Sequence, residues 1–122
     1  MARFRVSDPA REDLGNILAT SAERWGEEGR ERYAALLVAA MRTIARDPVG
    51  PTTRDRAALL PGLRSFHVRH ARRRSTVHDP VHVMFYRAAE SAIEIVRVLH
   101  ERMDPASHVA TTKPTTKRRR GT

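Results

Sequence analysis

The chain of 122 residues, 40% of them hydrophobic, is long enough for one compact domain that buries roughly two-thirds of its unfolded surface. It has no cysteine, which excludes disulfides and thiolate chemistry. It also lacks a signal-peptide-like start and a membrane span of roughly eighteen apolar residues, so we expect a cytoplasmic protein with no membrane partner. The formal net charge of +9 indicates an acidic partner without identifying it.

The chain is predicted to begin with a strand that leads into a helix. Residues 3–6 alternate charged and apolar side chains, as a half-buried edge strand does. Asp8 can cap free backbone amides and Pro9 suits the first helical position, so a helix should follow and run to about Arg24.

A second helix is predicted next. Apolar residues recur at spacings of three and four over residues 33–45, and Asp47-Pro48 ends the pattern. Residues 25–29 contain two glycines and should form the turn of an antiparallel helical hairpin. We expect Trp25 and Tyr33, on either side of this turn, to pack as a small part of the core.

The second half of the chain is predicted to form a sheet. Residues 49–61 read as a surface connection, and three segments rich in strand-forming residues follow at 63–70, 81–87 and 93–99. Only five residues separate the last two segments, so these segments should form a hairpin. The polar residues 71–80 should form an exposed hairpin connection between the first two. The predicted fold class is α+β, with an N-terminal strand, an antiparallel helical hairpin and a three-stranded antiparallel meander.

We predict one domain over residues 1–109 and a basic disordered tail over residues 110–122. The tail carries five Lys and Arg and no apolar side chain that could anchor it. Two interpretations of the tail stand side by side: a solvated segment without a specific role, and a segment that contacts nucleic acid non-specifically.

Several short motifs follow one another at characteristic spacing: Asp13-Leu14, Trp25-Gly26, Asp47-Pro48, Gly62-Leu63-Arg64-Ser65-Phe66, His82-Val83-Met84-Phe85-Tyr86-Arg87 and the run from Ile93 to Asp104. In this order, the motifs and elements resemble the ParE toxins of the RelE/ParE superfamily, from bacterial type II toxin-antitoxin systems, over about residues 4–109.

This resemblance implies a growth inhibitor whose usual target is DNA gyrase. It also implies a hetero-oligomer with a ParD-like antitoxin, whose C-terminal segment wraps the toxin and neutralises it. Operator DNA would be bound only indirectly, through the antitoxin.

The RelE branch of the superfamily, which cuts messenger RNA on the ribosome, is the first alternative. Two lysines of that branch correspond to His67 and Arg69 here, an arginine corresponds to Val83, a second arginine falls near Glu101, and no tyrosine follows Tyr86. RNA cleavage without a metal needs a general base, a general acid and a cation at the phosphorus. Because the two arginines and the late tyrosine of that branch are displaced or missing here, we expect no enzyme activity and no catalytic residue.

A basic nucleic-acid-binding module is the second alternative, because of the arginines near residue 73 and the basic tail. The aromatic content of 5% leaves few stacking platforms for single strands, and both helices mix acid with base. The histidines show no metal spacing and there is no glycine-rich phosphate loop, so we expect neither a metal nor a cofactor.

Two sets of residues are predicted to contact partners. The antitoxin-binding set, on the strands, is Arg64, Arg69, Arg87 and Arg97; solvated charges, or internal pairs with Glu90 or Glu94, are the alternative interpretation. The target-facing set, after the last strand, is His100, Arg102 and Met103.

Overall fold

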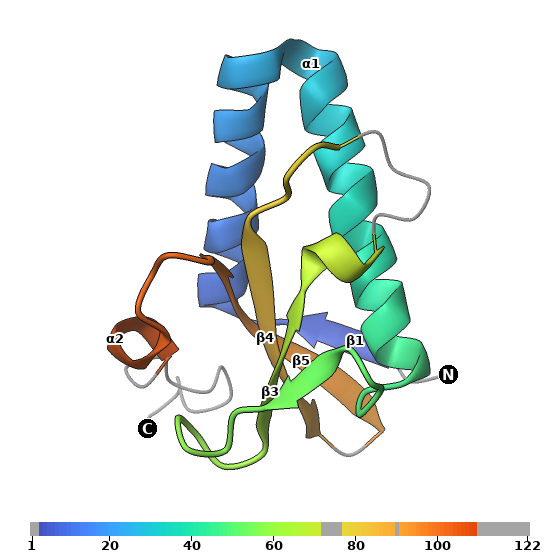
Figure 1. Ribbon diagram of the computed structural model, residues 1–122, viewed down its shortest axis with the longest axis vertical. Helices are drawn as coiled ribbons and strands as arrows, with labels where there is room; N and C mark the ends of the chain where they lie inside the picture. The colour runs from blue at the N-terminus through green and yellow to red at the C-terminus, as the bar shows by residue number, and fades with distance from the viewer. Residues whose placement is uncertain (1–2, 72–76, 90, 110–122) are drawn as a thin grey trace.

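The computed structural model describes residues 3–71, 77–89 and 91–109 and has an α+β fold. Its elements in chain order are β1 (Arg3–Val6), α1 (Asp8–Arg46), β2 (Thr53–Asp55), β3 (Leu63–His67), the 3-10 helix η1 (Val68–Ala71), β4 (His82–Ala89), β5 (Ala92–His100) and α2 (Pro105–Val109). The strands form one sheet in the order β1-β5-β4-β3-β2, and α1 covers one of its faces (Figure 1). The tail predicted for residues 110–122 lies outside the described residues.

The predicted meander of β3, β4 and β5 is confirmed, but it is part of a larger, mixed sheet. β1 adds to β5 in parallel, which is possible because the chain between these two strands is long and includes α1 and the strands β2, β3 and β4. β2 adds to β3 over only three residue pairs, too few for a periodic sequence signal, and it lies in the segment predicted as a surface connection. The segment predicted as one strand over residues 63–70 ends at His67, where η1 begins.

The predicted helical hairpin needs correction, because no separate loop divides the helices. α1 is one helix region of 39 residues, and only Gly26 inside it has a non-helical conformation, with φ 75° and ψ −175°. The kink at Gly26 divides α1 into two arms that lie side by side (Figure 1). The N-cap is Ser7 rather than Asp8, since the Ser7 hydroxyl accepts a hydrogen bond of 3.1 Å from the Ala10 amide.

Both faces of the sheet are buried in part, as the apolar character of the last strands predicts. The face toward α1 holds the larger core, which includes Leu36, Ile44, Phe66, Met84, Tyr86 and Ile95. The opposite face holds a smaller core formed by Leu63, Phe85, Val96, Leu99 and Val109. α2 contributes Val109 to this second core, and Leu59 and Leu60 from the segment before β3 pack against it.

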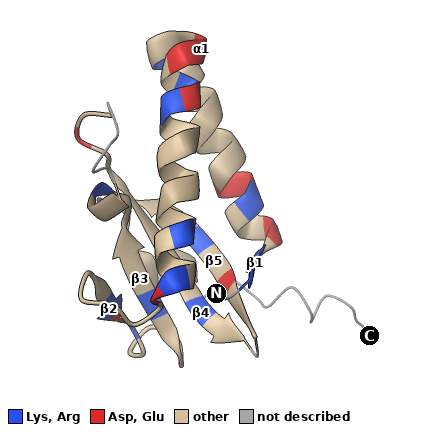
Figure 2. Ribbon diagram, turned by 90° about the vertical axis from the view of Figure 1, so that its right-hand side faces the viewer, with Lys and Arg blue, Asp and Glu red and all other residues tan. Residues whose placement is uncertain are grey.

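Charge is distributed unevenly over these layers. Figure 2 shows acidic and basic residues mixed along α1, whereas most charged positions on the strands are Lys or Arg. Within the part of the chain that the structure describes, no helix is long and apolar enough to cross a membrane.

Candidate functional site

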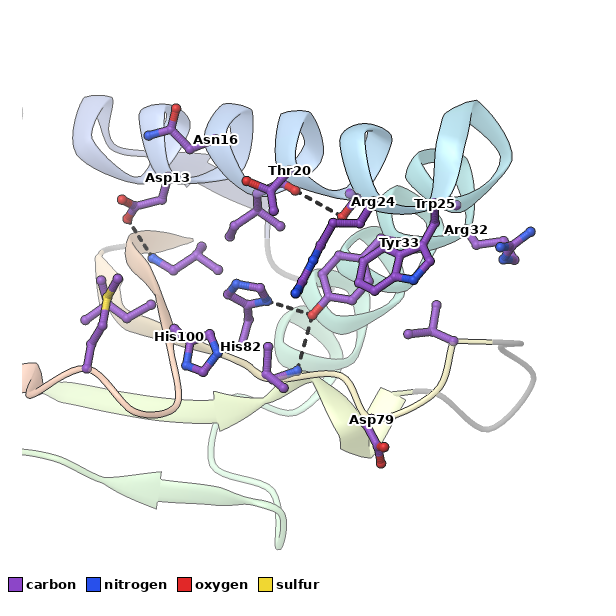
Figure 3. A pocket seen from close by; sticks show the side chains of 18 of the residues that line it. Asp13, Asn16, Thr20, Arg24, Trp25, Arg32, Tyr33, Asp79, His82 and His100 are labelled. Atoms are coloured by element: carbon purple, nitrogen blue, oxygen red, sulfur yellow. Dashed lines mark hydrogen bonds between the residues drawn. The ribbon is translucent and has the colours of Figure 1, made fainter.

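A groove of about 680 Å³ lies between the two arms of α1 and the neighbouring ends of β4 and β5 (Figure 3). Apolar side chains from several elements line it, namely Ile17, Trp25, Val77, Val81, Val98 and Met103. Basic side chains, among them Arg24 and Arg32, lie along the same groove. An apolar groove with basic groups beside it suits a segment with apolar anchors and acidic neighbours.

The floor of the groove is a hydrogen-bonded set of neutral side chains. The Tyr33 hydroxyl lies 2.7 Å from His82 Nδ1, accepts a bond of 3.4 Å from the Val81 amide, and meets the His82 ring edge-on (Figure 3). Burial, with the nearby charge of His100, lowers the pKa of His82 to about 4, and burial raises the pKa of Tyr33. Both groups are thus uncharged at neutral pH, and the floor is fixed in shape.

An ion pair closes the end of the groove near β5. Arg97 donates two hydrogen bonds to Asp13, of 2.7 and 2.9 Å, and these bonds raise the pKa of Arg97. Asp13 also accepts a bond of 2.9 Å from the Val98 amide, which lies beyond the last residue pair of β1 with β5, Val6 with Ile95. Asp13 therefore joins α1 to the edge of β5 where β1 no longer covers it.

The rim of the groove carries the single tryptophan of the chain. Trp25 is 58% exposed, and the Arg24 guanidinium lies 5.5 Å from its ring centre. The prediction that Trp25 joins the core is wrong, because Trp25 lies next to the kink, while the prediction for Tyr33 is confirmed. A Cβ atom at Gly29 would be 2.3 Å from the Trp25 Cβ, so the glycine makes room for the indole.

A second, smaller cavity of about 470 Å³ lies on the opposite face of the sheet and is bordered by basic residues. His67 is one of the residues that line it. Its Nε2 lies 2.7 Å from Glu101 Oε1, and its Nδ1 accepts a bond of 3.1 Å from the Arg69 amide. The hydrogen bond with His67 lowers the pKa of Glu101. Both ring nitrogens of His67 are therefore engaged within the protein.

The four residues of the predicted antitoxin-binding set do not form one surface. Arg97 is held by Asp13, and Arg87 pairs with Glu94 at 3.1 Å, as the alternative interpretation expects. Arg64 bonds to Thr53 Oγ1 at 2.8 Å, and Arg69 is exposed beside the second cavity. Glu90 lies outside the described residues.

The predicted target-facing set, in contrast, is brought together. His100 Nδ1 accepts a bond of 3.1 Å from the Arg102 amide, and the His100 ring lies 5.7 Å from that of His82. His100 and Met103 line both cavities, whereas Arg102 is exposed and lines neither. His100 and Met103 therefore lie at the boundary between the two cavities.

The pairing of Asp13 with Arg97 and the bond between Tyr33 and His82 leave no local signal in the sequence. In the sequence Asp13 stands out only as part of a short motif, and no local pattern links it to Arg97, which is 84 positions away. Among the described residues no group of three or more His, Asp or Glu could hold a metal ion.

Comparison with known proteins adds a family match. Residues 4–105 match the family model described as the ParE toxin of the type II toxin-antitoxin system, parDE. The chain is 35% identical over 109 residues to Toxin ParE1 of Caulobacter vibrioides, an alignment that covers 89% of this chain and 99% of the relative. It is 32% identical over 105 residues to Toxin ParE1 of Mycobacterium tuberculosis, covering 84% of this chain and 93% of that relative.

Proposed function

Because the chain belongs to the ParE toxin family of type II toxin-antitoxin systems, we propose that it arrests bacterial growth by poisoning DNA gyrase and that a ParD-like antitoxin neutralises it. The observation that carries this proposal is the family match over residues 4–105. A protein that acts on gyrase works in the cytoplasm. Operator DNA is contacted by the antitoxin, and by the toxin only through it.

The groove is the proposed docking site for the antitoxin. Trp25 and Met103 are large apolar side chains that remain 58% and 45% exposed, and such anchors are typical of a surface that a partner covers. An amphipathic antitoxin helix could place its apolar side on the groove floor, while acidic residues beside it approach Arg24 and Arg32. The +9 charge of the chain favours such an acidic partner.

Neutralisation would then occur by covering the target-facing residues. His100 and Met103 line the groove in which the antitoxin is proposed to bind. A segment that fills the groove would bury both side chains and keep them from the target. Arg102 lies outside the groove, so it offers a way to separate the two functions.

We propose that the chain is not an enzyme. General base catalysis at neutral pH needs an imidazole nitrogen that is free to take a proton. His67, the basic group nearest to the RelE pattern, has both nitrogens engaged, by Glu101 and by the Arg69 amide. This arrangement favours the ParE interpretation over ribosome-dependent cleavage of messenger RNA.

Growth assays and tryptophan fluorescence test the proposal together. Inducing the chain alone should arrest growth, and the ParD-like protein encoded beside it should restore growth. When a tryptophan-free version of that antitoxin binds, the emission of Trp25 should shift to shorter wavelength. Antitoxin binding that leaves this emission unchanged would place the antitoxin elsewhere.

Three variants test which residues contact the target and which contact the antitoxin. Arg102→Ala should weaken growth arrest and keep antitoxin binding, Met103→Asp should weaken both, and Arg42→Ala, an exposed arginine on α1 away from both cavities, should change neither. Full toxicity in both Arg102→Ala and Met103→Asp would contradict the target-facing assignment.

A further inference from the structure

The second cavity concentrates positive charge that the antitoxin groove does not use. Arg54 on β2, Arg56 just after it and Arg69 on η1 line the cavity. Of the described residues that line it, one is a carboxylate, Glu101, which is already bonded to His67. None of these three arginines forms an ion pair with a carboxylate of the described residues. Within the described residues, the cavity therefore presents three guanidinium groups to one carboxylate.

Arg56 and His70 show that this concentration of positive charge destabilises the protein when no ligand is bound. Arg56 Nε is buried and has no hydrogen-bond partner, and a buried donor without an acceptor costs about 1 to 3 kcal/mol. The pKa of His70 is lowered, first by burial and then by the charges of Arg69, His67 and Arg54. An anion in the cavity would offset the repulsion between these positive charges.

The shape and lining of the cavity indicate what kind of anion fits. Guanidinium groups bind phosphate oxygens through paired hydrogen bonds. Three guanidinium groups offer more hydrogen-bond donors than one carboxylate ligand can accept, which favours a phosphate. Val83 and Phe85 add an apolar surface, and the Arg56 guanidinium lies 5.6 Å from the Phe85 ring centre. The volume of about 470 Å³ can hold a group the size of a nucleotide.

We propose that this cavity binds a phosphate group, carried by a nucleotide or by a nucleic-acid strand. The ligand is bound and not cleaved, because both His67 nitrogens are occupied. The inference does not depend on the antitoxin or on gyrase. An antitoxin in the groove would leave Arg54 and Arg56 uncovered, since neither lines that groove.

Binding measurements on the full-length chain test the proposal. The protein is titrated separately with inorganic phosphate, with adenosine monophosphate and with a labelled single strand of about ten nucleotides. NMR signals of the arginine side chains show which arginines the ligand contacts. We expect Arg54→Ala with Arg69→Ala to weaken binding at least about tenfold and to lower the salt dependence, whereas Arg42→Ala changes affinity by less than about twofold. Every variant keeps residues 110–122, so the basic tail contributes equally to all of them.

Arg56→Lys keeps the charge but removes Nε, so a loss of affinity in a folded variant identifies the guanidinium fork as the recognising group. Binding of the nucleotide as well as the strand would identify a nucleotide site, and binding of the strand alone a backbone site. Equal affinity in the double variant and the wild type, or equally tight binding of an oligoglutamate peptide, would overturn the proposal.

Discussion

Asp13 is the residue on which the connection between α1 and the sheet most depends. It accepts two hydrogen bonds from Arg97 and one from the Val98 amide, and its side chain is 14% exposed. Asp13→Ala should lower the free energy of unfolding by about 2 to 3 kcal/mol, because it removes the carboxylate that accepts two hydrogen bonds from Arg97 and leaves the Val98 amide without this acceptor. Urea unfolding measures this, with Glu23→Ala, an exposed acid on α1, as the control. Equal stability of the two variants would contradict the role given to Asp13.

His82 should make the stability of the protein depend on pH. Its pKa is about 4 in the folded chain against an ordinary value of 6.5, so between these values the unfolded chain binds a proton that the folded chain does not. This contribution is therefore present above about pH 6.5 and is lost as the pH falls toward about 4. His82→Gln should flatten the dependence of the urea midpoint on pH in this range, and His78→Gln, at an exposed site, should not. Equal pH profiles of His82→Gln and the wild type would contradict the buried neutral state.

At the scale of elements, Gly26 permits the kink of α1. Its φ of 75° lies in the region that side chains disfavour, and nothing lies within 4 Å of a Cβ atom there, so the cost of a side chain comes from the backbone alone. Gly26→Ala should destabilise the protein by about 1 to 3 kcal/mol. Gly15→Ala is the matched control, at an equally open helical site, and should stabilise by up to about 1 kcal/mol. Thermal unfolding of both variants checks this, and a neutral Gly26→Ala would mean that the kink needs no glycine.

The sequence predicted the elements with strong periodicity and missed those without it. Alternation over Arg3–Val6 and the apolar runs of β4 and β5 are local signals, and the structure confirms these strands. β2 has only three residues and α2 only five, too short for a period to appear. Glycines near residue 26 indicated a turn, but whether such a turn breaks a helix or only bends it depends on backbone angles that composition does not specify.

The candidate site was predictable only in part, for a related reason. His100, Arg102 and Met103 lie within four positions, so a short turn keeps them close together, while their role toward the target stays a prediction. The four arginines on different strands were grouped by charge alone. Which face or partner each one reaches is decided by register and by distant residues such as Asp13, which a local pattern cannot show.

At the scale of the whole molecule, the +9 charge should act mainly on the rate at which the antitoxin binds. Raising the salt concentration from about 50 to about 500 mM should lower the association rate constant roughly tenfold or more, and change the dissociation rate constant less, because long-range attraction is screened while the apolar groove contacts are not. Stopped-flow measurement of Trp25 emission checks this. An association rate that does not change with salt would mean that charge does not steer the complex.

The effect on DNA gyrase is the most direct test of the proposed function. Purified gyrase is incubated with relaxed plasmid and the full-length chain, with and without the ParD-like antitoxin, and supercoiling and trapped DNA breaks are measured. The chain alone should reduce supercoiling or trap breaks, and the antitoxin should restore normal activity. Unchanged supercoiling without breaks, at concentrations where cells expressing the chain stop growing, would contradict gyrase as the target.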